Sequence, residues 1–420
     1  MKKLLIYLKD YKKESVLAPL FKMLEASFEL IVPLVVTQII DVGIANRDSG
    51  YILRMCLIMV ALGLIGLTCS ITAQYFAAKA AVGFGTQVRH QLFAHIQTFS
   101  FSEIDKVGTA TLITRMTSDI NQVQSGVNMV LRLFLRSPFI VFGAMIMAFT
   151  IDVKAALVFV VTIPLLSIVV FGIMAISIPL YRKVQERLDK VLGITRENLT
   201  GVRVIRAFHK EEEEKNRYEE SLGALTSMQN HVGRISAFMN PVTYIIINCG
   251  IIALLYIGAF QVDTGVLTQG QVVALVNYMS QILVELIKLA NLIVTITKAV
   301  ACGNRIESVL EMKSSMPIDV QKEQLGAVAG NKSEASEYMV EFSHVGLTYQ
   351  GAGAESLTDI DFQVKKGETI GIIGGTGSGK TSLVHLIPRF YDATAGEVKI
   401  NGKNVKDYPI EQLRQMVGIV

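Results

Sequence analysis

The sequence is poor in cysteine, and its four cysteines are spread along the chain. Cys56, Cys69, Cys249 and Cys302 show none of the short spacings that hold a metal ion. At least three of them lie in apolar runs, which predicts small buried apolar side chains. Cysteine therefore indicates neither a metal site nor a disulfide framework.

Charged residues are also scarce. They make up 18% of the 420 residues, and their formal balance is only +4. No basic stretch alternates with aromatic residues, so we expect no nucleic-acid partner. Residues 1–13 are basic but lack the small-residue cleavage site of a removable signal peptide.

Apolar residues are what the chain has in excess. They form 51% of the sequence, and the mean hydropathy of +0.44 is too high for an ordinary soluble enzyme. They are unevenly distributed: residues 16–300 hold long apolar runs, whereas 313–420 have the composition of a soluble domain.

Six apolar segments are long enough to cross about 30 Å of hydrocarbon at roughly 1.5 Å per residue. They lie near 16–40, 51–77, 133–151, 155–180, 237–260 and 271–297. Before them, residues 1–15 alternate lysines with apolar residues, which predicts a short amphipathic helix on the membrane surface.

Lysine and arginine indicate the orientation. The connections predicted to lie outside, at 41–50, 151–154 and 261–270, hold only Arg47 and Lys154. The N-terminal segment alone holds five lysines. Because basic loops stay in the cytoplasm, both termini are predicted to be cytoplasmic.

Two inner excursions, 78–132 and 181–236, are much longer than the outer loops. They are polar but keep helical periodicity, so each pair of helices is predicted to continue roughly 35–40 Å beyond the membrane. Helix-breaking residues place the two turns at 100–108 and 200–208. The alternative is that they are ordinary connecting loops of an unspecified membrane bundle.

Few charges lie inside the apolar segments. Lys22, Glu25 and Glu29 occur in the first, and Glu285 and Lys288 in the sixth. Ionisable groups are costly at membrane depth. They are interpreted either as the polar wall of a transport pathway or as self-neutralising pairs that lock helices together, and the sequence does not separate the two.

The stretch Gly374–Thr381 fits the phosphate-binding pattern G-x-x-x-x-G-K-[ST]. An apolar run at 368–373 predicts a buried strand before it, and apolar residues at helical spacing follow at 381–390. Glycines let backbone N–H groups converge on phosphate oxygens, while Lys380 would reach the β- and γ-phosphates and Thr381 a Mg²⁺ ion. The alternative is a glycine-rich turn that happens to precede a lysine.

The remaining C-terminal residues have the pattern of a small mixed domain. After a polar linker at 313–337, strands are predicted at 338–345, 359–364 and 397–405, with a hairpin turn at Asn401-Gly402. A short helix at 410–415 and a further strand at 416–420 follow.

This order of parts resembles a half-transporter of the ATP-binding cassette (ABC) exporter superfamily, of the bacterial multidrug and lipid-exporter type. The segments that carry the resemblance are 201–208, 376–380, 386–392 and 395–402. It implies an α-helical six-helix transmembrane domain followed by a partial α/β P-loop NTPase domain. The implied divisions are 1–15, 16–312, 313–337 as linker, and 338–420 as the N-terminal part of the nucleotide-binding domain.

The resemblance also assigns residues. It implies ATP with Mg²⁺ as cofactors, with adenine stacked on Tyr349. The predicted nucleotide contacts are Tyr349, Gly374, Gly375, Thr376, Gly377, Ser378, Gly379, Lys380, Thr381 and Ser382. The two turns correspond to coupling helices, with Ser102, Glu103, Ile104, Arg203, Ile205, Arg206 and Phe208 as contacts. In the second turn, Ile205 and Phe208 would be apolar anchors on the partner subunit, with the arginines at the rim.

The implied partners are a second half-transporter, as homodimer or heterodimer, and the lipid bilayer of a bacterial inner (plasma) membrane. The implied activity is ATP-driven export of amphipathic small molecules or lipids. The family's signature segment, second carboxylate motif, catalytic Glu and switch His have no match in the 420 residues, so no catalytic base is assigned.

We therefore expect the chain to be the N-terminal piece of a longer protein. The alternative is a catalytically incomplete partner subunit that assembles without hydrolysing ATP. A receptor or channel is disfavoured, because outer loops of ten residues or fewer leave no room for a ligand-binding domain.

Overall fold

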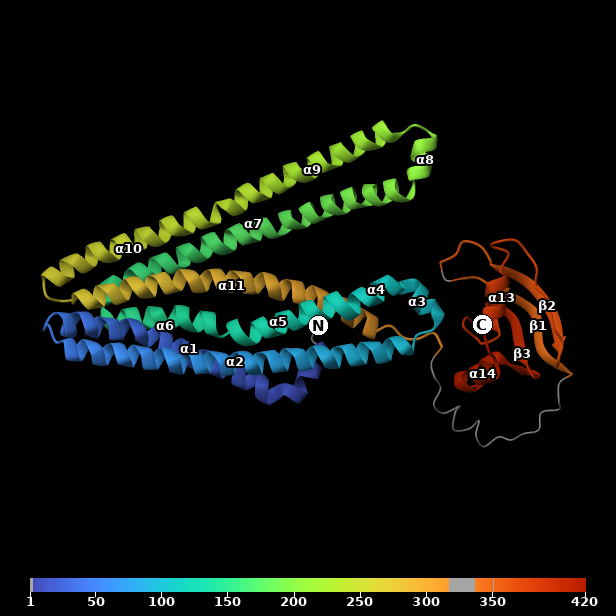
Figure 1. Ribbon diagram of the computed structural model, residues 1–420, viewed down its shortest axis with the longest axis horizontal. Helices are drawn as coiled ribbons and strands as arrows, with labels where there is room; N and C mark the ends of the chain where they lie inside the picture. The colour runs from blue at the N-terminus through green and yellow to red at the C-terminus, as the bar shows by residue number, and fades with distance from the viewer. Residues whose placement is uncertain (1–2, 317–336, 350) are drawn as a thin grey trace. The chain divides into compact units, whose positions relative to one another are not determined.

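The structure is a computed structural model that describes residues 3–316, 337–349 and 351–420 (Figure 1). Most of the predicted linker lies outside these residues. By its internal contacts the chain forms two compact units. One comprises residues 8–84 and 124–299, and the other comprises residues 1–7, 85–123 and 300–420.

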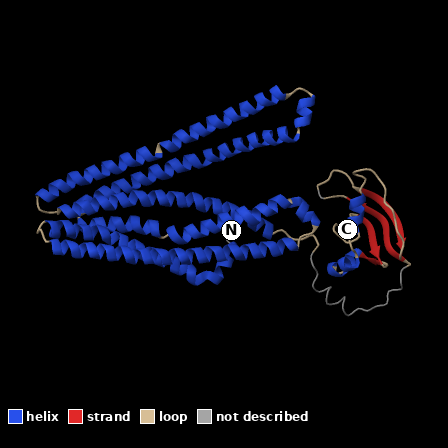
Figure 2. Ribbon diagram, viewed as in Figure 1, coloured by secondary structure: helices blue, strands red, loops and turns tan. Residues whose placement is uncertain are grey.

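Helices make up nearly all of the first 310 residues (Figure 2). The longer ones are α1 (Lys12–Gln38), α2 (Ser49–Gln97), α5 (Ile120–Leu133), α6 (Arg136–Ile151), α7 (Val153–Thr200), α9 (Glu211–Ala237), α10 (Met239–Asp263) and α11 (Gln269–Leu310). The short ones are α3 (Phe101–Val107), α4 (Thr109–Thr114) and α8 (Val202–Ala207). Two π-helical turns, Ile39–Ile44 and Arg115–Asp119, follow α1 and α4. In place of one amphipathic helix, the described residues 3–15 hold a 3₁₀ helix, Leu4–Tyr11, and the start of α1.

Among the described residues, six helical spans are long and apolar enough to cross a membrane. They are Leu4–Ile44, Ser49–Gln97, Thr109–Ile151, Val153–Thr200, Glu211–Asp263 and Gln269–Leu310. Each contains one of the predicted apolar segments, which confirms the six-helix transmembrane domain. As predicted, α2 and α7 remain helical well past their apolar parts, to Gln97 and Thr200.

The unit of residues 8–84 and 124–299 packs through small residues. In it, α7 lies against α9 and α10, and α6 lies against α1 and α7 (Figure 1). Four fully buried alanines of α6 and α7 let the helices approach closely: Ala144, Ala148, Ala155 and Ala156. Tyr278 of α11, also fully buried, donates its hydroxyl to the carbonyl of Leu30 on α1 at 2.6 Å. Such interhelical bonds satisfy polar groups where water is absent.

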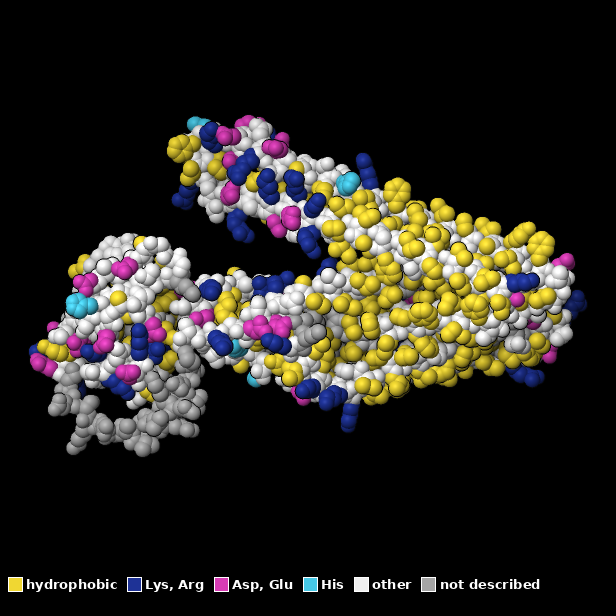
Figure 3. Space-filling model, turned by 180° about the vertical axis from the view of Figure 1, so that it is seen from behind, with side chains coloured by type: hydrophobic (Ala, Val, Ile, Leu, Met, Phe, Trp, Pro, Cys, Tyr) yellow, Lys and Arg dark blue, Asp and Glu magenta, His cyan; other side chains and the backbone are white. Residues whose placement is uncertain are grey.

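The outer surface of this bundle is apolar. On the face seen in Figure 3, hydrophobic side chains form a broad belt, and charged side chains gather beyond its two ends. Cys69 and Cys302 are buried as predicted, but Cys56 and Cys249 are exposed. The prediction was wrong for these two because a helix face turned to lipid is as apolar as a core, so an apolar run does not prove burial.

After residue 337 the chain forms a four-stranded antiparallel sheet of order β2-β1-β3-β4. Its strands are β1 (Tyr338–Leu347), β2 (Leu357–Lys365), β3 (Ala395–Ile400) and β4 (Lys403–Asn404). Phe342 of β1 pairs with Phe362 of β2, and their rings stack at 4.5 Å. The hairpin at Asn401-Gly402 is confirmed, because both residues have positive φ angles, 50° and 75°.

Two short helices, α13 (Lys380–Leu386) and α14 (Ile410–Met416), and a 3₁₀ turn, Val405–Asp407, complete this region. Leu383 and Leu386 of α13 and Leu413 of α14 join the core formed by the strands. The small sheet with its helices is consistent with the predicted partial nucleotide-binding domain.

The predicted strands at 368–373 and 416–420 are not formed. A strand needs a hydrogen-bonded neighbour, and the described strands pair only with one another in the antiparallel sheet. The run at 368–373 was predicted to be buried, but Ile370 and Ile372 are each 42% exposed and Ile373 is almost fully exposed. Its β-branched residues indicate an extended backbone, but they do not supply a partner.

Candidate functional site

The predicted phosphate loop is an exposed turn that leads into α13. Gly377 and Gly379 have φ angles of +86° and +85°, which residues other than glycine rarely adopt. A Cβ atom on Gly379 would lie 2.7 Å from Leu357 Cδ2 and 2.9 Å from the carbonyl oxygen of Ser356, and one on Gly374 would lie 2.5 Å from Ser378 Oγ. Gly379 is therefore required for both conformation and space, Gly377 for conformation, and Gly374 because a side chain there would crowd Ser378.

Lys380 folds back over this loop. Its Nζ donates to the carbonyl oxygens of Gly374 at 2.8 Å and Gly375 at 2.7 Å, and to Ser378 Oγ at 3.3 Å. Thr381 follows it on α13, and its side chain is exposed. The ammonium and the hydroxyl thus occur at one end of the helix, where the sequence predicts phosphate and metal contacts.

Tyr349, which is predicted to stack on adenine, is hydrogen-bonded to α13. Its hydroxyl donates to Ser382 Oγ at 2.8 Å. Its ring lines a cavity of about 550 Å³ together with Tyr391 and residues of α3, among them Ser102 and Asp105. The structure therefore brings Tyr349, Ser382 and the loop together around one end of α13.

The first turn, α3, contacts the C-terminal region in the same unit. Phe101 lies against the rings of Phe390 at 4.5 Å and Tyr391 at 6.1 Å. The Tyr391 hydroxyl donates to Asp105 Oδ2 at 2.6 Å, and Tyr391 stands edge-on to Tyr349 at 5.0 Å. Burial, and then the Asp105 carboxylate, raises the pKa of the Tyr391 hydroxyl, so it remains a donor. A continuous set of contacts joins α3 to Tyr349.

Glu103 fixes the start of α3. It caps the helix by accepting from the Ser100 backbone N–H at 2.9 Å and from Ser100 Oγ at 2.5 Å, and it also accepts from the Ser315 N–H at 3.1 Å. Burial raises the pKa of this carboxyl, but the hydrogen bonds from Ser100 and Ser315 outweigh burial, so the pKa is lowered overall. Glu103 is therefore a buried anion that holds two segments together, while Ser102 faces the cavity.

The second turn, α8, is built differently. None of its residues is buried, and Phe208, which ends it, is 72% exposed. Val204 is 61% exposed, and Arg203 and Arg206 are exposed beside it. Within the described residues of its unit, α8 is an uncovered apolar surface edged by basic side chains.

The charged residues of the first and sixth apolar segments are paired in the structure, and Arg136 of α6 joins them. Arg136 Nη1 lies 2.6 Å from Glu285 Oε1, and its Nη2 lies 2.6 Å from Glu29 Oε2. Lys288 Nζ lies 2.8 Å from the same oxygen of Glu285, and Ser137 Oγ donates to the other at 2.9 Å. These contacts form one alternating chain, Glu29–Arg136–Glu285–Lys288, which we call the charge chain. A separate ion pair lies nearer the start of α1, where Lys22 Nζ is 2.5 Å from Glu25 Oε2.

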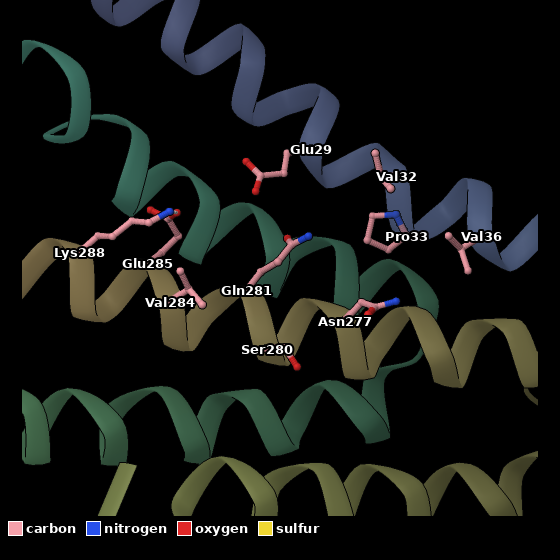
Figure 4. Close-up of a pocket in the computed structure, with 10 residues that line it drawn as sticks. All are labelled: Glu29, Val32, Pro33, Val36, Asn277, Ser280, Gln281, Val284, Glu285 and Lys288. Carbon is pink, nitrogen blue, oxygen red and sulfur yellow. Dashed lines mark hydrogen bonds and ion pairs between the residues drawn. The ribbon is translucent and has the colours of Figure 1, made fainter. Parts of the chain in front are cut away.

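The charge chain borders a cavity of about 370 Å³ between α1 and α11, which we call the bundle cavity (Figure 4). Its lining residues are Glu29, Val32, Pro33, Val36, Asn277, Ser280, Gln281, Val284, Glu285 and Lys288. The ion pairs therefore join α1, α6 and α11, as the second interpretation predicts. Glu29, Glu285 and Lys288 also line a cavity, and the transport pathway stays a prediction.

Sequence reasoning missed Arg136, Asp105 and Tyr391. Arg136 had a usable signal, because a lone arginine in an apolar segment requires a carboxylate partner. Asp105 and Tyr391 had none, because their contact joins segments 286 positions apart in the sequence.

The chain matches two models of known protein families. Residues 15–286 match the model of the ABC transporter transmembrane region, and residues 357–420 match the ABC transporter model. The chain is 33% identical over 420 residues to YfiB of Bacillus subtilis, an uncharacterized ABC transporter ATP-binding protein, and covers 72% of it.

Two further relatives have more specific names. YgaD of Bacillus subtilis, a putative multidrug export ATP-binding/permease protein, is 30% identical over 436 residues, and the match covers the whole chain and 72% of YgaD. The ATP-dependent lipid A-core flippase of Hahella chejuensis is 26% identical over 418 residues, covering the whole chain and 70% of the flippase. With six membrane spans, a phosphate-type loop and these matches, the chain belongs to the ABC transporter family, as a multi-pass membrane protein of the exporter half-transporter type.

Proposed function

We propose that the chain is a subunit that uses ATP to export amphipathic small molecules or lipids. The observation that carries the proposal is the loop Gly374–Thr381, in which Gly377 and Gly379 have positive φ angles and the Lys380 ammonium lies over the loop. Membership of the ABC transporter family supports it. So do relatives named as a multidrug exporter and as a lipid flippase.

The residues present fit Mg²⁺ and ATP. Lys380 would exchange its bonds to the Gly374 and Gly375 carbonyls for bonds to phosphate oxygens, which are better partners for an ammonium because they carry charge. The exposed Thr381 hydroxyl is an oxygen donor of the kind that Mg²⁺ prefers. Bound Mg²⁺ would supply charge neutralisation at the phosphates. Tyr349 would offer a flat ring to adenine, with its hydroxyl held by Ser382.

Transport requires a route through the helices and a second subunit. The bundle cavity offers polar and apolar walls at one place, which suits an amphipathic molecule. ABC exporters typically act as dimers, and the uncovered surface of α8 suits contact with a second half-transporter.

Both termini are proposed to be cytoplasmic, because the short connections between spans hold few lysines and arginines. Cysteines introduced at Ser49 and Thr264 should react with an impermeant maleimide added outside intact cells, and cysteines at Ser102 and Thr200 should not. External labelling at Thr200 would reverse the proposed orientation.

The central test is Lys380→Ala, with Lys366→Ala as a matched exposed control. Lys380→Ala should weaken binding of trinitrophenyl-ATP with Mg²⁺ by about tenfold or more, because a charge-assisted contact to phosphate is lost. Membrane insertion should be unchanged. Equal nucleotide affinity in Lys380→Ala and Lys366→Ala would overturn the assignment. ATP hydrolysis is measured in parallel, because binding without hydrolysis would instead assign the role of a non-hydrolysing partner.

A further inference from the structure

Two accessible members of the charge chain, of opposite charge, line the bundle cavity. Its inner members, Arg136 and Glu285, have side chains that are 8% and 3% exposed, whereas Glu29 and Lys288 at its ends are 41% and 42% exposed. Glu29 and Lys288 both line the cavity, the first from α1 and the second from α11 (Figure 4). A ligand in the cavity therefore meets an accessible carboxylate and an accessible ammonium.

The remaining walls are divided between apolar and polar groups. Val32, Pro33 and Val36 form an apolar edge on α1. On α11, Asn277, Ser280 and Gln281 form a polar edge of the cavity. A hydrogen bond from an N–H cation to a carboxylate is charge-assisted, so Glu29 favours a ligand whose cation carries N–H donors.

We propose that the bundle cavity binds the head group of a zwitterionic amphiphile whose cation is an N–H-bearing ammonium. The ammonium donates to the Glu29 carboxylate, and the phosphate or carboxylate of the ligand pairs with Lys288. The apolar edge of α1 accepts the beginning of the hydrocarbon chain. The inference rests on the proposed function, because it names the class of molecule that the exporter moves.

Charge matching selects this class over its neighbours. A purely cationic amphiphile would place its charge near Lys288 without a compensating anion, and a purely anionic one would do the same near Glu29. A cavity of about 370 Å³ holds a head group, whereas a whole lipid is larger.

The test uses the full chain in dodecyl maltoside without nucleotide, and measures binding of tritiated lysophosphatidylethanolamine by scintillation proximity. Competitors of the same acyl length are lysophosphatidylcholine, lysophosphatidic acid and an alkylamine. Unlabelled lysophosphatidylethanolamine should compete at concentrations roughly tenfold lower than lysophosphatidic acid or the alkylamine, each of which carries charge of one sign only, because it makes both charged contacts. Equal competition by all four compounds would overturn the proposal.

Two variants locate the site. Glu29→Gln should remove the advantage of the zwitterion over lysophosphatidic acid, and it should also abolish the preference for ethanolamine over choline, which has no N–H donor for the carboxylate. Lys288→Gln should remove the advantage of the zwitterion over the alkylamine. The control is Glu14→Gln, which removes the carboxylate of the Glu14–Lys79 pair at another place on α1.

Lysophospholipid binding that is the same in Glu29→Gln and Lys288→Gln as in Glu14→Gln would refute this site. Because no nucleotide is present, the result is independent of the ATP assignment. Selective lysophospholipid binding, together with a nucleotide affinity that Lys380→Ala leaves unchanged, would uphold the cavity assignment and reject the proposed exporter function. Unselective lysophospholipid binding, together with a nucleotide affinity that Lys380→Ala weakens, would reject the cavity assignment and uphold the exporter function.

Discussion

The two cytoplasmic turns predicted from the sequence, α3 and α8, have similar lengths but opposite surroundings. In its unit, α3 buries Glu103 and packs Phe101 against the aromatic rings that precede β3. In its own unit, α8 buries nothing and leaves Phe208 72% exposed. The aromatic side chain of α3 is thus packed within its unit, whereas the apolar surface of α8 is exposed in its own unit.

This difference separates two kinds of contact. An aromatic ring already packed in the folded chain contributes to the stability of that chain, whereas an exposed ring contributes only when another surface covers it. Substitutions in α3 should therefore change unfolding, and substitutions in α8 should change assembly and the coupling of ATP hydrolysis to transport.

The largest expected effect is that of Phe208→Ala. Loss of the ring should cost about 3 kcal/mol of contact free energy if a partner subunit encloses it. In the assembled transporter, stimulation of ATP hydrolysis by transported compound should fall towards unity, since that stimulation measures the coupling between sites. The thermal unfolding temperature of the isolated chain should not change.

Phe238→Ala is the matched control, because Phe238 is a similarly exposed ring, 65% accessible, at the other end of α9. An unaltered stimulation ratio in a folded, dimeric Phe208→Ala protein would remove the distinction between the turns.

A smaller effect is expected from Phe101→Ala in α3. The ring is 38% exposed and contacts Phe390 and Tyr391, so its loss should lower the free energy of unfolding by about 1–3 kcal/mol. Denaturant unfolding followed by circular dichroism measures this. Phe93→Ala, at a more exposed ring on α2, should change it by less than about 0.5 kcal/mol. Similar losses in both variants would mean that α3 is not held by this contact.

The smallest expected effect is a pH dependence that only α3 should show. Hydrogen bonds from Ser100 and Ser315 outweigh burial and lower the pKa of Glu103, so the folded state favours its ionised form. This stability is complete above the unfolded pKa of about 4.3 and is lost as the pH falls through the lower folded value. The difference in unfolding free energy between the parent and Glu103→Gln should therefore shrink between pH 6 and pH 3. A difference that stays constant over this range would show that the carboxylate charge is not what stabilises the cap.

Much of the membrane unit was predictable because hydropathy and helix length are local properties. The six spans and the continuation of α2 and α7 to the turns follow from residues close in sequence. The hairpin at Asn401-Gly402 follows for the same reason. The run at 368–373 was predicted incorrectly, because a strand depends on a neighbour that composition does not specify.

The candidate sites also differ in whether they depend on residues close in the sequence or on residues far apart. The phosphate loop is a contiguous motif, so its residues could be named in advance, and they remain a prediction for nucleotide contact. The charge chain could be named only in part. Glu29, Glu285 and Lys288 stand out as charges in apolar segments, but their connection through Arg136 depends on the packing of α1, α6 and α11.

The members of the charge chain are synthesised at different times, because they lie far apart in the sequence. Arg136 follows Glu29 by 107 positions and precedes Glu285 by 149. At roughly 5–20 residues per second, a ribosome makes Glu285 about 7–30 s after Arg136. When the third span enters the bilayer, Glu29 is therefore the carboxylate of the charge chain that has already been made. Glu29 is thus the first carboxylate available to pair with Arg136, because Glu285 is synthesised only with the last described span.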